Sequence, residues 1–184
     1  MVALVLGLTA SVPACAGGTP DAQNPDRPLP TYDSHSAELF DDAIEPTAMG
    51  YPSDTSVGRP MGDTRLRERS QVGDAVVRAK VTTVTSKAED RGRSWQMGLR
   101  TTEHLAGSGP LPKDFLLSVD PTDPAAGILR GFEARLIGSS FVAFVREFRR
   151  AGAPGDSDLH FHLAADSPEE IQAVKAALVS DEVH

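Results

Sequence analysis

Alternating apolar and polar positions dominate the chain from residue 74 onward and predict a β-sheet. Residues 74–85 read DAVVRAKVTTVT, which places Val77, Ala79 and Val81 on one face and charged or hydroxyl side chains on the other. Similar alternation, or a short apolar run, predicts further strands over residues 93–104, 114–119, 139–148 and 158–163. Because both alternating sets of the 139–148 segment are apolar, we expect both of its faces to be covered. Residues 128–136 are compatible with a strand or a helix.

Short helices are predicted before and after these strands. Ser34 or Ser36 is expected to cap the first helix, which ends before Pro46. Its predicted apolar face holds Leu39, Phe40, Ala43 and Ile44. The last helix is expected to begin at Ser167 and Pro168, and its predicted apolar face holds Ile171, Val174 and Leu178. The acidic pairs at 41–42 and 169–170 are assigned to the first turns of these helices, where the helix dipole stabilises carboxylates.

Together these elements predict an α+β fold that is mainly β. We expect a small five- to six-stranded antiparallel OB-like barrel or curled sheet, with a short N-terminal helix and a C-terminal helix. Residues 15–33 contain several prolines and little apolar surface, and therefore predict a disordered tether. The predicted organisation is a signal peptide (1–14), this tether, a short helix and loop (34–63), and one β-rich domain (64–184).

The N-terminal apolar run is too short to cross a membrane and has the length of a signal-peptide core. Residues 12–15, VPAC, resemble the lipobox of bacterial lipoproteins, although Pro13 departs from it and no basic residue precedes the run. A start codon upstream of the printed Met is one hypothesis for the missing basic residue. The resemblance implies that Cys15 is lipidated, with a fatty acid such as palmitate, and anchors the chain to a lipid bilayer. Because Ala16 follows the cysteine, it also implies an outer-membrane lipoprotein facing the periplasm or cell surface, where the organism has an outer membrane.

The order of the predicted strands resembles that of small exported OB-like barrels of the netrin-module type. The likeness covers about residues 72–163 and rests on the runs 75–85, 95–101 and 115–119, followed by Gly138 and an apolar strand. The disulfide cysteines of that family are absent, so its protease inhibition is not carried over. The whole chain also resembles uncharacterised bacterial lipoproteins, which implies a location and no activity.

Charge gives little support to a nucleic-acid partner. The net charge is -8, and residues 64–150 carry fifteen basic and ten acidic residues that are scattered along the segment. We therefore expect no nucleic-acid binding.

His160 and His162 form the strongest candidate for chemistry. Residues two apart in a strand point to the same side, which Asp158 would share. Glu103 or His104 would be needed to approach the three or four ligands of a zinc site. The favoured interpretation is that both histidines face water while Phe161 and Leu163 face the core, with no metal and no cofactor bound.

The chain carries no motif for a known reaction. It has no GxSxG, HExxH, phosphate loop or CxxC; Ser139 and Ser140 are read as the start of a strand, and Trp95 as a core residue. We therefore expect a membrane-anchored lipoprotein that is not an enzyme. It would be a binding or structural module of the cell envelope, with an unidentified envelope protein or glycan as partner. Two alternatives stay open: a periplasmic metal-binding protein or enzyme that uses His160 and His162, and a secreted soluble protein without lipid.

Overall fold

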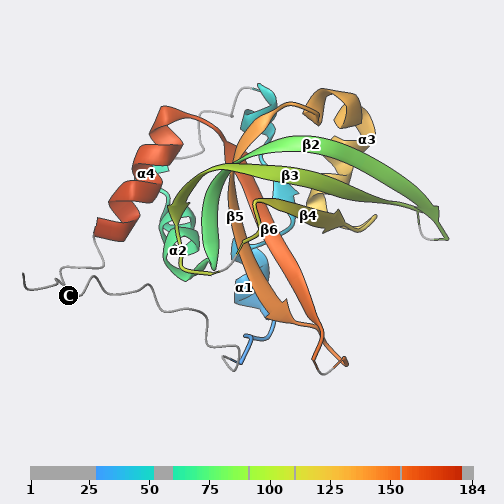
Figure 1. Ribbon diagram of the computed structural model, residues 1–184, viewed down its shortest axis with the longest axis horizontal. Helices are drawn as coiled ribbons and strands as arrows, with labels where there is room; N and C mark the ends of the chain where they lie inside the picture. The colour runs from blue at the N-terminus through green and yellow to red at the C-terminus, as the bar shows by residue number, and fades with distance from the viewer. Residues whose placement is uncertain (1–27, 52–59, 91, 110, 154, 180–184) are drawn as a thin grey trace, which may run out of the picture.

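The computed structural model describes residues 28–51, 60–90, 92–109, 111–153 and 155–179 (Figure 1). Six strands form one sheet in the order β1-β6-β5-β2-β3-β4. The strands are β1 (Ala43–Ile44), β2 (Ala75–Glu89), β3 (Gly92–Ala106), β4 (Asp114–Val119), β5 (Ser140–Arg149) and β6 (Ser157–Ala165). The helices are α1 (Ser34–Leu39), α2 (Thr64–Val72), α3 (Pro124–Leu136) and α4 (Pro168–Val179), with 3₁₀ turns η1 (Pro46–Met49) and η2 (Pro60–Gly62). The predicted signal peptide, Cys15 and the first part of the predicted tether lie outside the described residues.

The α+β class is confirmed. Of the two predicted architectures, a barrel or a curled sheet, the barrel is wrong because the sheet stays open, and the prediction that all of its strands are antiparallel is also wrong. The sheet is mixed, because β1 runs parallel to β6 while the other neighbouring strands are antiparallel. It curls until β4 contacts β6, yet no hydrogen-bonded ladder joins these two strands. The physical reason is that β1 occupies part of the β6 edge that β4 would need for closure.

The long hairpin of β2 and β3 arches over the rest of the sheet (Figure 1). The strand predictions at 74–85 and 93–104 are therefore confirmed; β2 starts at Ala75 and continues past the predicted end to Glu89, and β3 extends slightly beyond both predicted ends. The predictions for β4, β5 and β6 are confirmed in the same way. The alternation of side chains across a pleated strand is local information, which explains why the sequence contained it.

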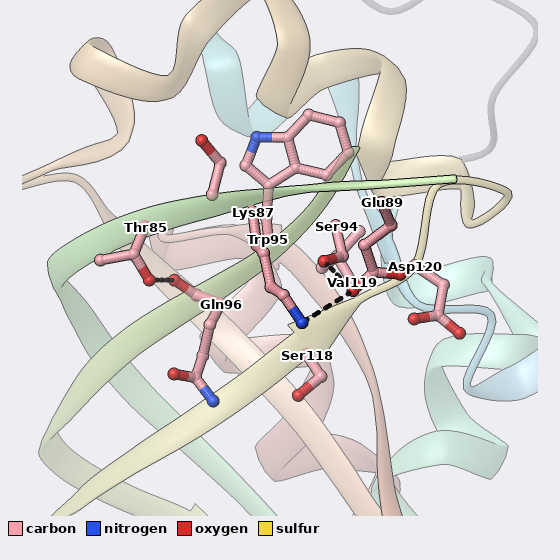
Figure 2. A pocket seen from close by; sticks show the side chains of 10 residues that line it. Thr85, Lys87, Glu89, Ser94, Trp95, Gln96, Ser118, Val119 and Asp120 are labelled. Atoms are coloured by element: carbon pink, nitrogen blue, oxygen red, sulfur yellow. Dashed lines mark hydrogen bonds and ion pairs between the residues drawn. The ribbon is translucent and has the colours of Figure 1, made fainter. Parts of the chain in front are cut away.

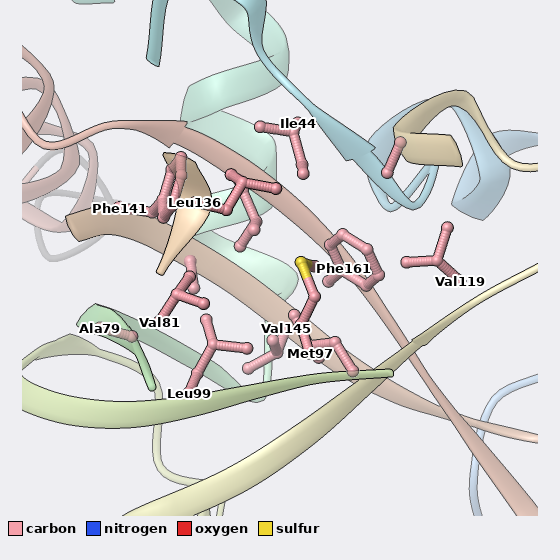
Figure 3. Close-up of a cluster of buried hydrophobic side chains, with 14 of the residues drawn as sticks. Ile44, Ala79, Val81, Met97, Leu99, Val119, Leu136, Phe141, Val145 and Phe161 are labelled. Carbon is pink, nitrogen blue, oxygen red and sulfur yellow. The ribbon is translucent and has the colours of Figure 1, made fainter. Parts of the chain in front are cut away.

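Two apolar cores lie on opposite faces of the sheet. The inner core is covered by α3, and Figure 3 shows Met97, Leu99, Phe141 and Phe161 converging there. The outer core is covered by α1, α2 and α4. Strand β5 contributes to both cores, which confirms that its two faces are covered. Its buried residues are Phe141, Val142, Ala143, Phe144, Val145 and Phe148.

The ambiguous segment 128–136 is part of a helix. α3 starts with Pro124 at its first position, and it buries Ala125, Leu129 and Leu136 at spacings of about one or two helical turns. Seven residues separate Leu129 from Leu136, a spacing that a strand would place on opposite faces.

The first helix is shorter than predicted and is capped differently. The carboxylate of Asp33, rather than Ser34 or Ser36, accepts a hydrogen bond from the Ser36 N–H at 2.8 Å. α1 ends at Leu39, and Asp42 then adopts a left-handed conformation (φ 50°) that turns the chain into β1. Ile44 therefore belongs to a strand and packs in the inner core, whereas Leu39 packs in the outer core.

α2 is a helix that the sequence analysis did not assign. Asp63 accepts hydrogen bonds from the N–H groups of Arg65 and Leu66 at 2.8 and 3.3 Å, which caps its first turn. Leu66 and Val72 are its only apolar residues, so its hydrophobic periodicity is weak. By contrast, the predicted start of α4 is confirmed, because the Ser167 hydroxyl accepts from the Glu170 N–H at 3.1 Å.

Candidate functional site

The pairing of β1 with β6 brings three carboxylates to the two predicted histidines. The Asp42 N–H donates to the Phe161 carbonyl at 2.9 Å, and the Glu45 N–H donates to the Leu163 carbonyl at 2.9 Å. This register places the acidic segment 41–45 beside the part of β6 that holds His160 and His162. The acids at 41 and 42 therefore do not stabilise a helix start, as the sequence analysis assumed.

His162 lies between two carboxylates. Its Nδ1 is 2.8 Å from Asp41 Oδ1 and its Nε2 is 3.0 Å from Glu45 Oε1, and the residue is 5% exposed. Burial by itself would lower the pKa of His162, but the two hydrogen bonds outweigh burial and raise it. The pKa values of Asp41 and Glu45 are lowered, because their bonds to His162 outweigh the effect of burial on each carboxylate. The expectation that this histidine faces water is wrong.

Arg69 of α2 and Glu170 of α4 border this arrangement. The Arg69 Nε donates to the Leu39 carbonyl at 2.5 Å, and burial lowers the pKa of its guanidinium. Glu170 is 7% exposed, and burial together with the charge of Glu45 raises its pKa to about 7. We call this set the buried ionic cluster: Asp41, Glu45, Arg69, His162 and Glu170. Its members flank β1 or lie on α2, β6 and α4, so it joins both helices to the sheet.

His160 has a different environment. Its Nδ1 is 2.6 Å from Asp42 Oδ2, and its ring stacks on Tyr32 with centroids 3.7 Å apart and planes 5° apart. The ring also meets the edge of Phe148. Within the described residues, its Nε2 has no hydrogen-bond partner. The bond to Asp42 fixes the orientation of the imidazole and leaves Nε2 as the nitrogen for contact with another molecule.

Tyr32 belongs to a segment that the sequence analysis assigned to the tether. Residues 28–33 lie against the end of β5, where Arg149 donates its N–H to the Pro30 carbonyl and its guanidinium to the Leu29 carbonyl. The Tyr32 hydroxyl donates to the Phe40 carbonyl at 2.7 Å, and burial and the nearby Asp42 raise its pKa to about 12. This segment therefore holds the aromatic ring that packs on His160.

Asp42 combines backbone strain with burial. Its Oδ1 accepts the Phe161 N–H at 3.0 Å and its carbonyl accepts the Ala125 N–H at 3.1 Å, which together hold its left-handed backbone. Burial raises the pKa of its carboxyl, and the bond to His160 only partly offsets that effect. Such strained residues occur preferentially at functional sites.

The His160–Asp42 pair lines a cleft of about 550 Å³ between β4 and β6. We call it the acidic cleft; its lining residues are Asp42, Leu116, Ser118, Asp120, Asp123, Arg150, Ser157, Asp158, Leu159 and His160. Arg150 pairs with Asp158, with Nε at 2.9 Å from Oδ1. Asp120 and Asp123 form no ion pair with another described residue, although the charge of His160 acts on Asp123 from a distance. The cleft therefore carries uncompensated negative charge.

Asp123 is the more buried of these two carboxylates. It accepts the Asp120 N–H at 2.7 Å, and burial and the charges of Asp42 and Asp120 raise its pKa. A cation placed beside it would relieve the repulsion among these carboxylates, which is a physical reason for the cleft to favour positive charge.

A second hollow of about 420 Å³ lies on the β2–β3 hairpin and meets the acidic cleft at Ser118 and Asp120. Figure 2 shows that both Lys87 and Ser94 contact Glu89, so part of its polar lining is already paired. Trp95 is 3% exposed and packs in the inner core, which confirms the core prediction. Its indole N–H is buried without a partner among the described residues, and nothing in the structure explains that. We regard this hollow as the weaker candidate site.

The other residues considered from the sequence lie elsewhere. Glu103 and His104 are on β3, which β5 and β2 separate from β6, and Glu103 pairs with Arg78 at 3.0 Å. The Ser139 hydroxyl donates to the Arg135 carbonyl. In the part of the chain that the structure describes, no three His, Cys, Asp or Glu side chains are arranged to hold a metal ion.

Comparisons with models of protein families and with curated proteins found no match to this chain. Across the described residues, none of the helices has the length and apolar character needed to span a bilayer.

Proposed function

We propose that the protein is a membrane-anchored lipoprotein of the cell envelope whose folded domain binds a cationic, amine-bearing ligand in the acidic cleft. The observation that carries the binding part is the pair of carboxylates, Asp120 and Asp123, that form no ion pair among the described residues and line a cleft of about 550 Å³. The anchoring part rests on the lipobox-like sequence at Cys15. The ligand would be carried by an envelope protein or glycan.

Charge and shape together favour such a ligand. A cleft in which negative charge predominates concentrates its electric field and so raises the local concentration of cations. Leu116 and Leu159 supply apolar contacts on the two sides, while Ser118 offers a hydroxyl group; the Ser157 hydroxyl already donates to Glu147. This combination suits an amine on a partly apolar carrier better than an anion or a purely apolar molecule.

Spermidine serves as the probe for the binding part. We expect saturable binding by calorimetry and chemical-shift changes at His160 and Asp123, with affinity that falls as salt is raised. The double variant Asp120→Asn, Asp123→Asn should weaken binding at least tenfold. It should also keep the loop, since the new amide oxygen at position 123 can still accept the backbone N–H of residue 120. Glu169→Gln, an exposed change on α4, is the matched control. Equal spermidine affinity of the wild type and the double variant would overturn the proposal.

Metabolic labelling with a clickable fatty acid tests the anchor. Label is expected on the wild-type chain and not on Cys15→Ser. An unlabelled wild-type chain recovered free from the periplasm or medium would contradict anchoring and favour the secreted alternative.

One observation favours a second function, acid–base catalysis by His160. A carboxylate on Nδ1 with Nε2 free of partners among the described residues is the arrangement in which an imidazole takes a proton from water or a hydroxyl. p-Nitrophenyl acetate is a simple probe: hydrolysis above that of His160→Gln supports this function, and equal rates contradict it. His162 suits neither this role nor metal binding as it stands, because both of its ring nitrogens are engaged by carboxylates.

A further inference from the structure

The edge of β6 is only partly covered. β1 pairs with it at His162 and Leu163. The Asp42 side chain accepts a hydrogen bond from the Phe161 N–H, and the Asp42 N–H donates to the Phe161 carbonyl. In an antiparallel ladder successive residues direct their N–H and C=O groups to opposite sides of the strand. Leu159 therefore directs its backbone groups to the same side as Phe161, where no partner for them lies among the described residues. This uncovered stretch of the edge lines the acidic cleft.

The opposite wall of the cleft is a second sheet edge. Among the strands that the structure describes, β4 pairs with β3 alone, and its Leu116 is 55% exposed. β4 and β6 contact each other without sharing a ladder, so the cleft is a slot between two sheet edges. Exposed strand edges are templates for another extended chain.

We propose that the acidic cleft receives an extended, basic peptide segment of another envelope protein, which adds as a strand to β6 at Leu159. The proposal deepens the proposed function and rests on it. Backbone hydrogen bonds to the edge would supply affinity, and Lys or Arg side chains would meet Asp120 and Asp123. β1 already shows that this edge accepts a parallel strand, because two residues of the same chain are paired there.

Charge complementarity selects this occupant over other peptides. An acidic segment would face four carboxylates, Asp42, Asp120, Asp123 and Asp158, whereas the basic groups of the cleft, Arg150 and His160, are already bonded to Asp158 and Asp42. An apolar segment would contact Leu116 and Leu159 but leave those carboxylates desolvated without partners. A segment that alternates basic and β-branched residues offers both kinds of contact, because the basic side chains on one face of the added strand can meet the carboxylates while the β-branched side chains on its other face can pack against leucine.

The experiment uses the synthetic peptide acetyl-Lys-Thr-Lys-Val-Lys-Thr-Lys-amide and a copy with N-methyl groups on alternate backbone nitrogens. The methyl groups remove the donors of one peptide edge and leave every charge in place. We expect at least tenfold weaker binding of the methylated copy by calorimetry, and at least tenfold slower hydrogen exchange of the Leu159 amide when the unmodified peptide is bound. A copy with Glu in place of Lys is the charge control and should not bind.

The outcomes separate the two proposals. If both basic peptides bind equally and the Leu159 amide stays unprotected, strand addition is overturned while cation binding in the cleft stands. If neither spermidine nor either basic peptide binds, the proposed function is wrong, and the proposal of strand addition is wrong as well. Because the modification is made in the peptide, misfolding of a protein variant cannot imitate either result.

Discussion

His160 and His162 lie two residues apart on the same face of β6, yet their surroundings differ completely. His162 has a carboxylate on each ring nitrogen and is 5% exposed. His160 has one carboxylate and one stacked aromatic ring, and it lines the acidic cleft. The difference follows from β1, whose two residues pair with β6 at 162–163 and stop short of His160. The extent of one short strand thus decides which histidine is structural and which can meet a ligand.

The largest effect is expected from removing the structural histidine. His162→Ala removes the cation hydrogen-bonded to both Asp41 and Glu45 and leaves only the more distant charge of Arg69 beside them. Breaking an ion pair around a buried histidine in this way is expected to cost about 3 kcal/mol of unfolding free energy. Urea unfolding at neutral pH measures this loss. His160→Ala is the matched control, and equal destabilisation by the two variants would contradict the distinction between the histidines.

The buried ionic cluster also predicts how stability depends on pH. The pKa of Glu170 is raised from 4.5 to about 7, so its carboxyl binds a proton more tightly in the folded state. The stability from this proton is full below pH 4.5 and is lost as the pH rises towards 7, a fall of about 3 kcal/mol. Glu170→Gln should flatten the unfolding free energy over this range.

His162 also makes the folded state less stable as the pH rises, but over a higher pH range than Glu170. Since the folded pKa of His162 lies above 6.5, its contribution to stability is complete below pH 6.5 and is lost as the pH rises through the raised pKa. Asp41 and Glu45 have lowered pKa values, so their contributions are complete above about pH 4.5 and are lost as the pH falls through the folded values. In the Glu170→Gln variant, the unfolding free energy is still expected to fall with pH above pH 6.5. An unfolding free energy that does not change with pH there would show that His162 is not held as an imidazolium.

A smaller loss of stability is expected at the cleft. His160→Ala removes one hydrogen bond and the ring contacts with Tyr32 and Phe148, but Asp42 keeps the Phe161 N–H as a partner and its raised pKa eases protonation. We expect a cost of about 1–2 kcal/mol in urea unfolding. Spermidine binding should change severalfold, since the ring is part of the cleft wall. Unchanged spermidine affinity would indicate that the ligand does not reach His160.

The smallest effect is expected at the aromatic ring beside the cleft. Tyr32→Phe keeps the stacked ring and removes the bond to the Phe40 carbonyl, at a cost of about 1 kcal/mol or less. Tyr32→Leu also removes the stacking and should shift the NMR signals of the His160 ring. If the two variants move those signals equally, the hydroxyl rather than the ring positions His160.

The strands were predictable because alternation is local. β2, β3, β4, β5 and β6 were each found within a few residues of their ends. α2 was missed because few of its residues are apolar, and the start of β1 was read as helix because Ala43 and Ile44 fit helical spacing after Leu39. The left-handed Asp42, which ends that helical spacing, is held by contacts with Phe161 and Ala125 from distant parts of the chain.

The candidate site was only half predictable. The sequence singled out His160 and His162 from their spacing, and placed Asp158 with them. It assigned Asp41 and Asp42 to a helix, although three carboxylates within residues 41–45 beside a short apolar pair were a signal for a polar strand. Nothing local linked that segment to β6.

The sequence by itself determined the α+β class, the core-facing positions of most strands, the charge and the lipobox-like N-terminus. These depend on the two-residue period of a strand and on residue chemistry. Tertiary structure alone decided that the sheet stays open, that one histidine is buried in an ionic cluster and that the other lines a cleft. The reason is that Asp42 and His160 are 118 positions apart, and only the register of β1 on β6 brings them within 2.6 Å.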